Sequence, residues 1–60
     1  MLVKDFFLMC ANGVKVAIEE RESRRTVFEG VIGSFAKCNF FEEKIAWIST
    51  RGDVILLIIE

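Results

Sequence analysis

The stretch ISTRGDVILLII, residues 48–59, decides how the fold of this 60-residue chain is interpreted. Arg51-Gly52-Asp53 forms a charged turn signal, and the apolar residues Val54 to Ile59 follow without interruption. A strand with one face in water alternates apolar and polar residues, so this strand needs cover on both faces. A chain this short buries only about 60% of its unfolded surface. We therefore expect the last strand to pair with a neighbouring copy of the same protein.

Length and composition also favour assembly. Residues 1–60 are one domain, and 53% of them are hydrophobic. Small domains usually need disulfides, a metal or oligomerisation for stability. The chain has two cysteines in no paired motif and no histidine, so we expect no disulfide, no metal site and no cofactor. Oligomerisation remains, and we expect a homo-oligomer.

The periodicity of the chain predicts an all-β protein with one N-terminal helix. Apolar residues at Val3, Phe6, Phe7 and Cys10 have helical spacing, which predicts a helix over residues 1–12. Residues 13–60 are expected to form a small, strongly bent, five-stranded antiparallel barrel. Its strands are expected at residues 14–19, 26–35, 39–42, 45–49 and 54–59. The polar segment 21–25 is expected to be a turn, and its arginines, with the nearby Glu19, Glu20 and Glu22, are expected to form a solvated hairpin tip.

Two of the expected strands, residues 45–48 and 54–59, are apolar on both faces. One face of each would pack inward and the other would meet another subunit. The residues expected at this interface are Ile45, Trp47, Val54, Ile55, Leu57 and Ile59.

The chain resembles the Sm-like family of small β-barrels. Phe28, Gly30, Ile32 and Phe35 stand at the offsets of the first family signature. Arg51-Gly52, followed by Ile55 and Ile58, matches the second signature. The resemblance implies an N-terminal helix, an Sm-like or SH3-like barrel, and a hexameric or heptameric ring closed by strand pairing between subunits.

The resemblance also implies binding of single-stranded RNA or a nucleotide-like ligand at the ring centre. The candidate ligand-binding residues are Arg51, Gly52, Asn39, Lys37 and Phe35. An arginine can bind phosphate or stack on a base, and asparagine can read a base edge. The alternative for Arg51 is an ion pair with Asp53 or with a neighbour's carboxylate.

A second function from another class remains open. The chain could be a homo-oligomeric protein-interaction or assembly module, such as a phage or accessory protein, that binds no nucleic acid. The net charge of −1 and the pI near 5.4 favour this alternative, because binding to a phosphate backbone needs a basic surplus. Ala36, where the family usually has aspartate, favours it too.

Catalysis, membrane insertion and secretion are not expected. The chain has no histidine base and no glycine-rich phosphate loop, so we expect no enzyme and no catalytic residues. No apolar run approaches the roughly 18 residues of a membrane span. The first residues lack the pattern of a signal peptide, and we expect a cytoplasmic protein.

Overall fold

The computed structural model describes residues 1–33 and 39–60, and there one helix precedes four strands. The helix α1 spans Val3–Met9, and the strands are β1 (Lys15–Glu20), β2 (Thr26–Val31), β3 (Ile45–Arg51) and β4 (Val54–Ile59). The prediction of an N-terminal helix followed by short strands is confirmed, although the helix is shorter than expected. No helix in these residues is long and apolar enough to cross a membrane.

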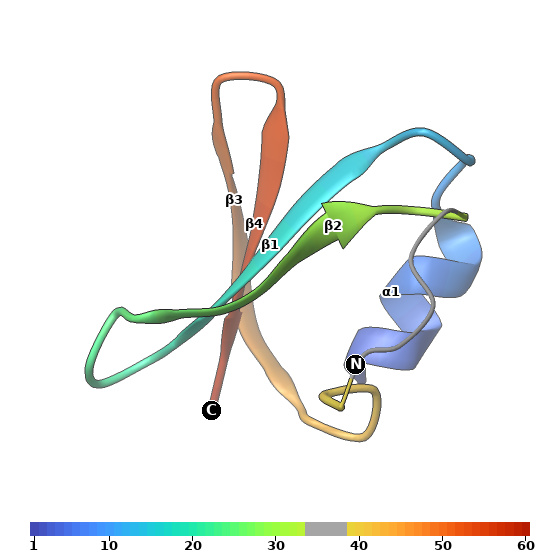
Figure 1. Ribbon diagram of the computed structural model, residues 1–60. Coiled ribbons are helices and arrows are strands. Elements are labelled where there is room, and N and C mark those ends of the chain that lie inside the picture. The colour runs from blue at the N-terminus through green and yellow to red at the C-terminus, as the bar shows by residue number, and fades with distance from the viewer. Residues whose placement is uncertain (34–38) are drawn as a thin grey trace.

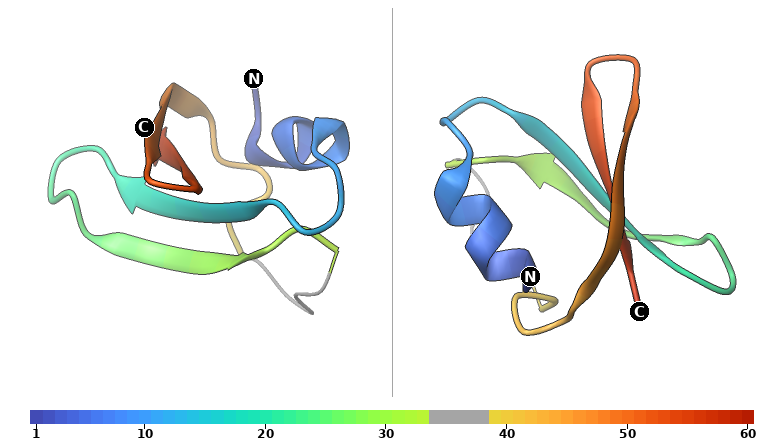
Figure 2. Two further views of the ribbon diagram at one scale, coloured as in Figure 1. Left: turned by 90° about the horizontal axis from the view of Figure 1, so that it is seen from above. Right: turned by 180° about the vertical axis from the view of Figure 1, so that it is seen from behind.

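The strands form one mixed sheet in the order β2-β1-β4-β3 (Figure 1). Antiparallel hairpins join β1 to β2 and β3 to β4. The central strands β1 and β4 are parallel, in register from Lys15 opposite Val54 to Glu20 opposite Ile59. The sheet is strongly twisted, so the two hairpins cross each other steeply in Figures 1 and 2.

The helix covers one face of this sheet, which we call the inner face. Val3 and Phe7 of α1 belong to the same buried core as Ile18 of β1. The Phe7 ring centroid lies 5.5 Å from that of Phe41 in an edge-to-face arrangement and 6.3 Å from that of Phe28. Aromatic pairs of this kind add about 0.5–1.5 kcal/mol beyond the burial of their area. The rings thereby connect α1 to β2 and to the segment before β3.

The position of β4 explains its two apolar faces without a neighbouring copy. Leu57 lies in the core under the helix, and Ile58 lies on the opposite face; both side chains are 0% exposed. The backbone of β4 pairs with β1 on one side and with β3 on the other. The expectation that Val54–Ile59 pairs with another subunit is therefore wrong, because both edges of this strand are already used within the chain.

Two further expectations about the sheet are corrected. Residues 39–42 form a turn instead of a strand, because their backbone serves the start of the helix: the Lys4 N–H donates to the Phe41 carbonyl at 3.0 Å. The parallel β1–β4 pair replaces the expected all-antiparallel arrangement. The described residues form a four-stranded sheet with β2 and β3 at its edges, so a five-stranded barrel is not confirmed.

Candidate functional site

The sheet face opposite α1, which we call the outer face, carries a group of charged side chains around an apolar centre. Side chains alternate between faces along a strand, so the pairing registers assign residues to this face. Its apolar centre consists of Ala17, Leu56 and Ile58, which are 5%, 4% and 0% exposed. In the described part of the chain no helix covers this centre, and long side chains from the surrounding strands and turns supply its cover.

A buried carboxylate lies in the middle of the outer face. Glu19 is 3% exposed, and its two oxygens are bound by arginines from opposite ends of the sheet. The Arg24 Nε donates to Oε1 at 3.0 Å and the Arg51 Nη2 donates to Oε2 at 3.0 Å. Because β4 lies between β1 and β3, the Arg51 side chain must cross β4 to reach Glu19. The ion pair therefore joins the two hairpins.

These partners set the charge of Glu19. The hydrogen bond from Arg24 lowers the pKa of the Glu19 carboxyl, burial opposes this by raising it, and the bond from Arg51 lowers it again. The resulting pKa lies below the usual range of a glutamate. Glu19 is therefore ionised at neutral pH, as a buried carboxylate must be paired to remain charged.

The conformation of the turn between β1 and β2 directs the Arg24 side chain to the outer face. Arg24 has a φ of 57°, a left-handed conformation that costs a residue with a side chain roughly 1–3 kcal/mol. Its N–H donates to the Glu20 carbonyl at 2.9 Å, and its side chain reaches Glu19. These bonds offset the strain of the turn.

A second arginine of the same turn lies on an exposed aromatic ring. The Arg21 guanidinium carbon is 5.8 Å from the centroid of the Trp47 ring, within the range of a cation–π contact. Trp47 is still 45% exposed. The outer face therefore combines three arginines, one exposed tryptophan and a single buried carboxylate.

This arrangement can bind an anion or a flat aromatic group. Arg24 and Arg51 each give one donor to Glu19, and their side chains are 53% and 65% exposed. A guanidinium has five N–H donors, so donors remain at the surface. Lys15 and Asp53, at the far end of the face, neutralise each other at 3.1 Å.

The second candidate surface is the outer edge of β3. Trp47 points to the outer face and Ile48 to the inner face, and they are 45% and 47% exposed. An edge strand presents unpaired N–H and carbonyl groups that can accept another strand. The edge of β3 therefore combines free backbone groups with two exposed apolar side chains.

The predicted ligand-binding residues do not form one cluster in the described chain. Arg51 and Gly52 lie at the β3–β4 turn, where Gly52 has a φ of 63°, as a two-residue hairpin requires of its first turn residue. Asn39 is exposed in the turn before β3, so the length of β3 separates it from Arg51. Lys37 and Phe35 lie outside the described residues.

The predicted interface residues also divide into two groups. Trp47 is exposed at the edge of the sheet. The others are half-buried or buried within the chain itself. They are Ile45, Val54, Ile55, Leu57 and Ile59.

Sequence reasoning missed the burial of Glu19, which it placed on the polar side of a half-buried strand, next to a solvated hairpin tip. The local signal was present, since Lys15, Ala17 and Glu19 share one face of an alternating strand. That alternation does not show whether the face is covered. The burial of Glu19 depends on Arg51, which is 32 positions away in the sequence.

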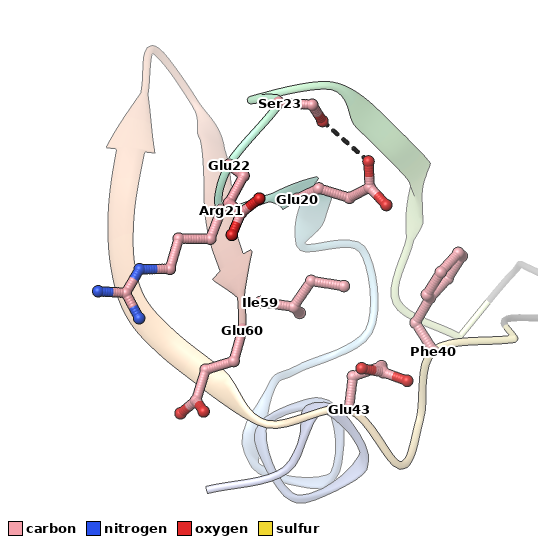
Figure 3. A pocket seen from close by; sticks show the side chains of 8 residues that line it. All are labelled: Glu20, Arg21, Glu22, Ser23, Phe40, Glu43, Ile59 and Glu60. Atoms are coloured by element: carbon pink, nitrogen blue, oxygen red, sulfur yellow. Dashed lines mark hydrogen bonds between the residues drawn. The ribbon is translucent and has the colours of Figure 1, made fainter.

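A hollow of about 760 Å³ opens on the inner side of the sheet, where β1 and β4 end (Figure 3). Carboxylates of Glu20, Glu22, Glu43 and Glu60 line it, and Glu20 accepts a hydrogen bond from Ser23 at 2.8 Å. The Arg21 side chain points away from the hollow in Figure 3. Within residues 1–33 and 39–60 no three acidic, cysteine or histidine side chains gather closely enough to hold a metal ion.

Comparisons of this chain with protein-family models, with curated proteins and with solved structures find no match. The resemblance to the Sm-like family therefore stays a prediction from the sequence.

Proposed function

We propose that this chain is a homo-oligomeric protein-interaction module that assembles by adding a strand of a second copy to the outer edge of β3. The observation that carries this proposal is the exposure of Trp47 and Ile48 on opposite faces of one edge strand. A strand added at this edge would cover both side chains. It would also satisfy the backbone groups between them.

The two edges of the sheet differ in how well they resist pairing. Natural proteins protect edge strands with charged residues, and β2 carries the exposed Glu29 at its middle. By contrast, Ala46–Thr50 in β3 contains no charged residue. This difference favours β3 as the edge that accepts a partner.

A second copy is the partner that this strand fits best. Pairing two copies of an uncharged segment places no like charges opposite each other, which would destabilise the pair. The same exposed apolar side chains occur on both partners, so each copy supplies cover for the other. A different protein would need an uncharged extended segment of its own to pair with β3, whereas a second copy of this chain already has one.

The experiment introduces a charge at the edge. We expect Ile48→Lys to shift the protein to monomer in sedimentation velocity, because a lysine on an edge strand opposes pairing. The control is Glu29→Lys, which places lysine on the other edge and should leave assembly intact. An oligomer unchanged by Ile48→Lys, or lost with Glu29→Lys instead, would contradict the proposal.

A second candidate function is binding of single-stranded RNA or a nucleotide-like ligand at the outer face. The observation favouring it is that the Arg24 and Arg51 side chains are 53% and 65% exposed on the same face of the sheet as the exposed Trp47 ring. Aromatic rings stack on bases, and arginines pair with phosphate. For this function, the N–H donors of Arg51 that are not bonded to Glu19 would bind the phosphate of the ligand.

Fluorescence anisotropy with a short labelled single-stranded RNA tests this candidate. Arg51→Ala should abolish binding, whereas Lys44→Ala, which removes a positive charge near the opposite end of β3, should leave the affinity close to that of the unmodified chain. Equal affinities of the two variants would exclude the outer face as the binding site.

A further inference from the structure

We infer that the two copies pair antiparallel, β3 against β3, about a two-fold axis at Ser49, so that Trp47 of each copy packs against Arg51 of the partner subunit. This inference rests on the proposed assembly and specifies its register, its symmetry and its size. It follows from which backbone groups of β3 are free.

The β3–β4 hairpin determines which groups point outward. Its turn consists of Gly52 and Asp53, and Arg51 is paired with Val54. The two residues that flank a two-residue turn exchange both of their backbone hydrogen bonds with each other. Along each strand of the hairpin, residues whose N–H and carbonyl groups point to the partner strand then alternate with residues whose groups point away from it. Arg51, Ser49 and Trp47 therefore bond to β4, whereas Ile48 and Thr50 direct their N–H and carbonyl groups away from the sheet.

The start of β3 is already covered. The Ile45 N–H donates to the Met1 carbonyl at 2.9 Å, and the Val3 N–H donates to the Glu43 carbonyl at 3.0 Å. The register then shifts between Ile45 and Trp47, which disrupts regular pairing at the intervening residue. Among the described residues, regular free groups therefore remain at Ile48 and Thr50.

Only one antiparallel register pairs all of these groups between identical strands. With the axis at Ser49, Ile48 lies opposite the partner's Thr50, and Thr50 lies opposite the partner's Ile48. Each of these pairs exchanges two backbone hydrogen bonds. An axis at Ile48 would instead require pairing through Ala46, where the register is irregular.

The same register matches the side chains. Trp47 lies opposite the partner's Arg51 on the outer face, and cross-strand pairs of this kind interact directly. Arg51 is held across the sheet by Glu19 at 3.0 Å, and the Trp47 ring is 45% exposed. Because the Arg51 guanidinium reaches across β4 to Glu19, the ring of the partner's Trp47 would pack on the apolar stem of Arg51. The partner would add this contact to the one that Trp47 already makes with Arg21 of its own chain at 5.8 Å.

A two-fold contact also limits the size of the assembly. It uses the same surface on both copies and closes after two. Both β2 strands then form the outer edges of one continuous sheet, each carrying the exposed Glu29. The inferred assembly is thus a dimer, whereas a ring would require the β3 edge of one copy to meet the β2 edge of the next.

Disulfide trapping tests the register. In a background with Cys10→Ala and Cys38→Ala, Ser49→Cys places the two thiols opposite each other at a non-hydrogen-bonded position. Their Cα atoms would be about 4.5 Å apart, within the range that a disulfide spans. We expect oxidation to convert Ser49→Cys to a covalent dimer, while the controls Thr50→Cys and Glu29→Cys lose little monomer.

Hydrogen exchange provides a second measurement on the unmodified chain. The amides of Ile48 and Thr50 should exchange slowly when the protein is concentrated and rapidly when it is dilute, because the second copy supplies their hydrogen bonds. Concentration-independent exchange at both amides in an associated protein would overturn the inference.

The outcomes separate the inference from the proposal on which it rests. A protein that sediments as a monomer at every concentration contradicts both. In a mixture of the two variants, oxidation could instead link Ser49→Cys of one copy to Glu29→Cys of another. That result, or a closed ring, would support assembly through β3 and overturn the two-fold pairing.

Discussion

Replacing Ile58 by valine tests whether β4 is the central strand of a single chain. Ile58 is 0% exposed and lies on the outer face of β4. Ile58→Val removes one methylene and keeps the β-branched shape, which typically costs about 0.5–1.5 kcal/mol in a core. In a domain of this size about 1 kcal/mol shifts the melting temperature by roughly 4–8 °C. The expected decrease is therefore about 2–12 °C.

The matched control is Ile48→Val, the same change at a side chain that is 47% exposed. At concentrations where the chain is monomeric, its effect should stay within about 0.5 kcal/mol. Both variants are melted by circular dichroism at several protein concentrations, because association makes the melting temperature depend on concentration. Equal decreases in the two variants, or a decrease for Ile58→Val that disappears on dilution, would refute the central position of β4.

Three other predictions concern the turn, the helix and the buried carboxylate. Gly52→Ala should destabilise the chain by about 1–3 kcal/mol in chemical denaturation, because a side chain is strained at a φ of 63°; an unchanged midpoint would mean a different turn. Phe7→Ala should cost about 3–5 kcal/mol, whereas Leu8→Ala, at a side chain 85% exposed, should change little; similar losses would contradict the docking of α1. The lowered pKa of Glu19 means that its stabilisation is complete above the pKa of the unfolded chain and is lost as pH falls through the folded value. Glu19→Gln should therefore flatten the acid side of the stability profile, and an unaltered profile would show that its pairs with arginine do not contribute.

Much of the fold follows from local patterns. The spacing of Val3 and Phe7 predicted the helix, and the polar segment 21–25 predicted the turn between β1 and β2. The last strand occupies the expected residues, Val54–Ile59. These features were predictable because the period of apolar residues and the chemistry of turns act over a few neighbouring positions.

The candidate surfaces were only partly predictable. Trp47 was expected at an interface, and it is exposed at an edge of the sheet. Arg51 was expected to bind a ligand or a nearby carboxylate, and its ion pair is with the distant Glu19. Neither the burial of Glu19 nor the free edge of β3 could be read from local spacing, because each depends on which strands become neighbours.

The sequence by itself determined the helix, four strands with their order, and the need to cover both faces of Val54–Ile59, but it also predicted a strand at residues 39–42, which is a turn. Only the tertiary structure decided what covers them: the parallel pairing of β1 with β4 places the last strand at the centre and leaves β3 at an edge. The physical reason is that an apolar strand has the same free-energy gain from burial by its own chain as by another copy. The choice between the two depends on long-range pairing, which the period of the sequence does not encode.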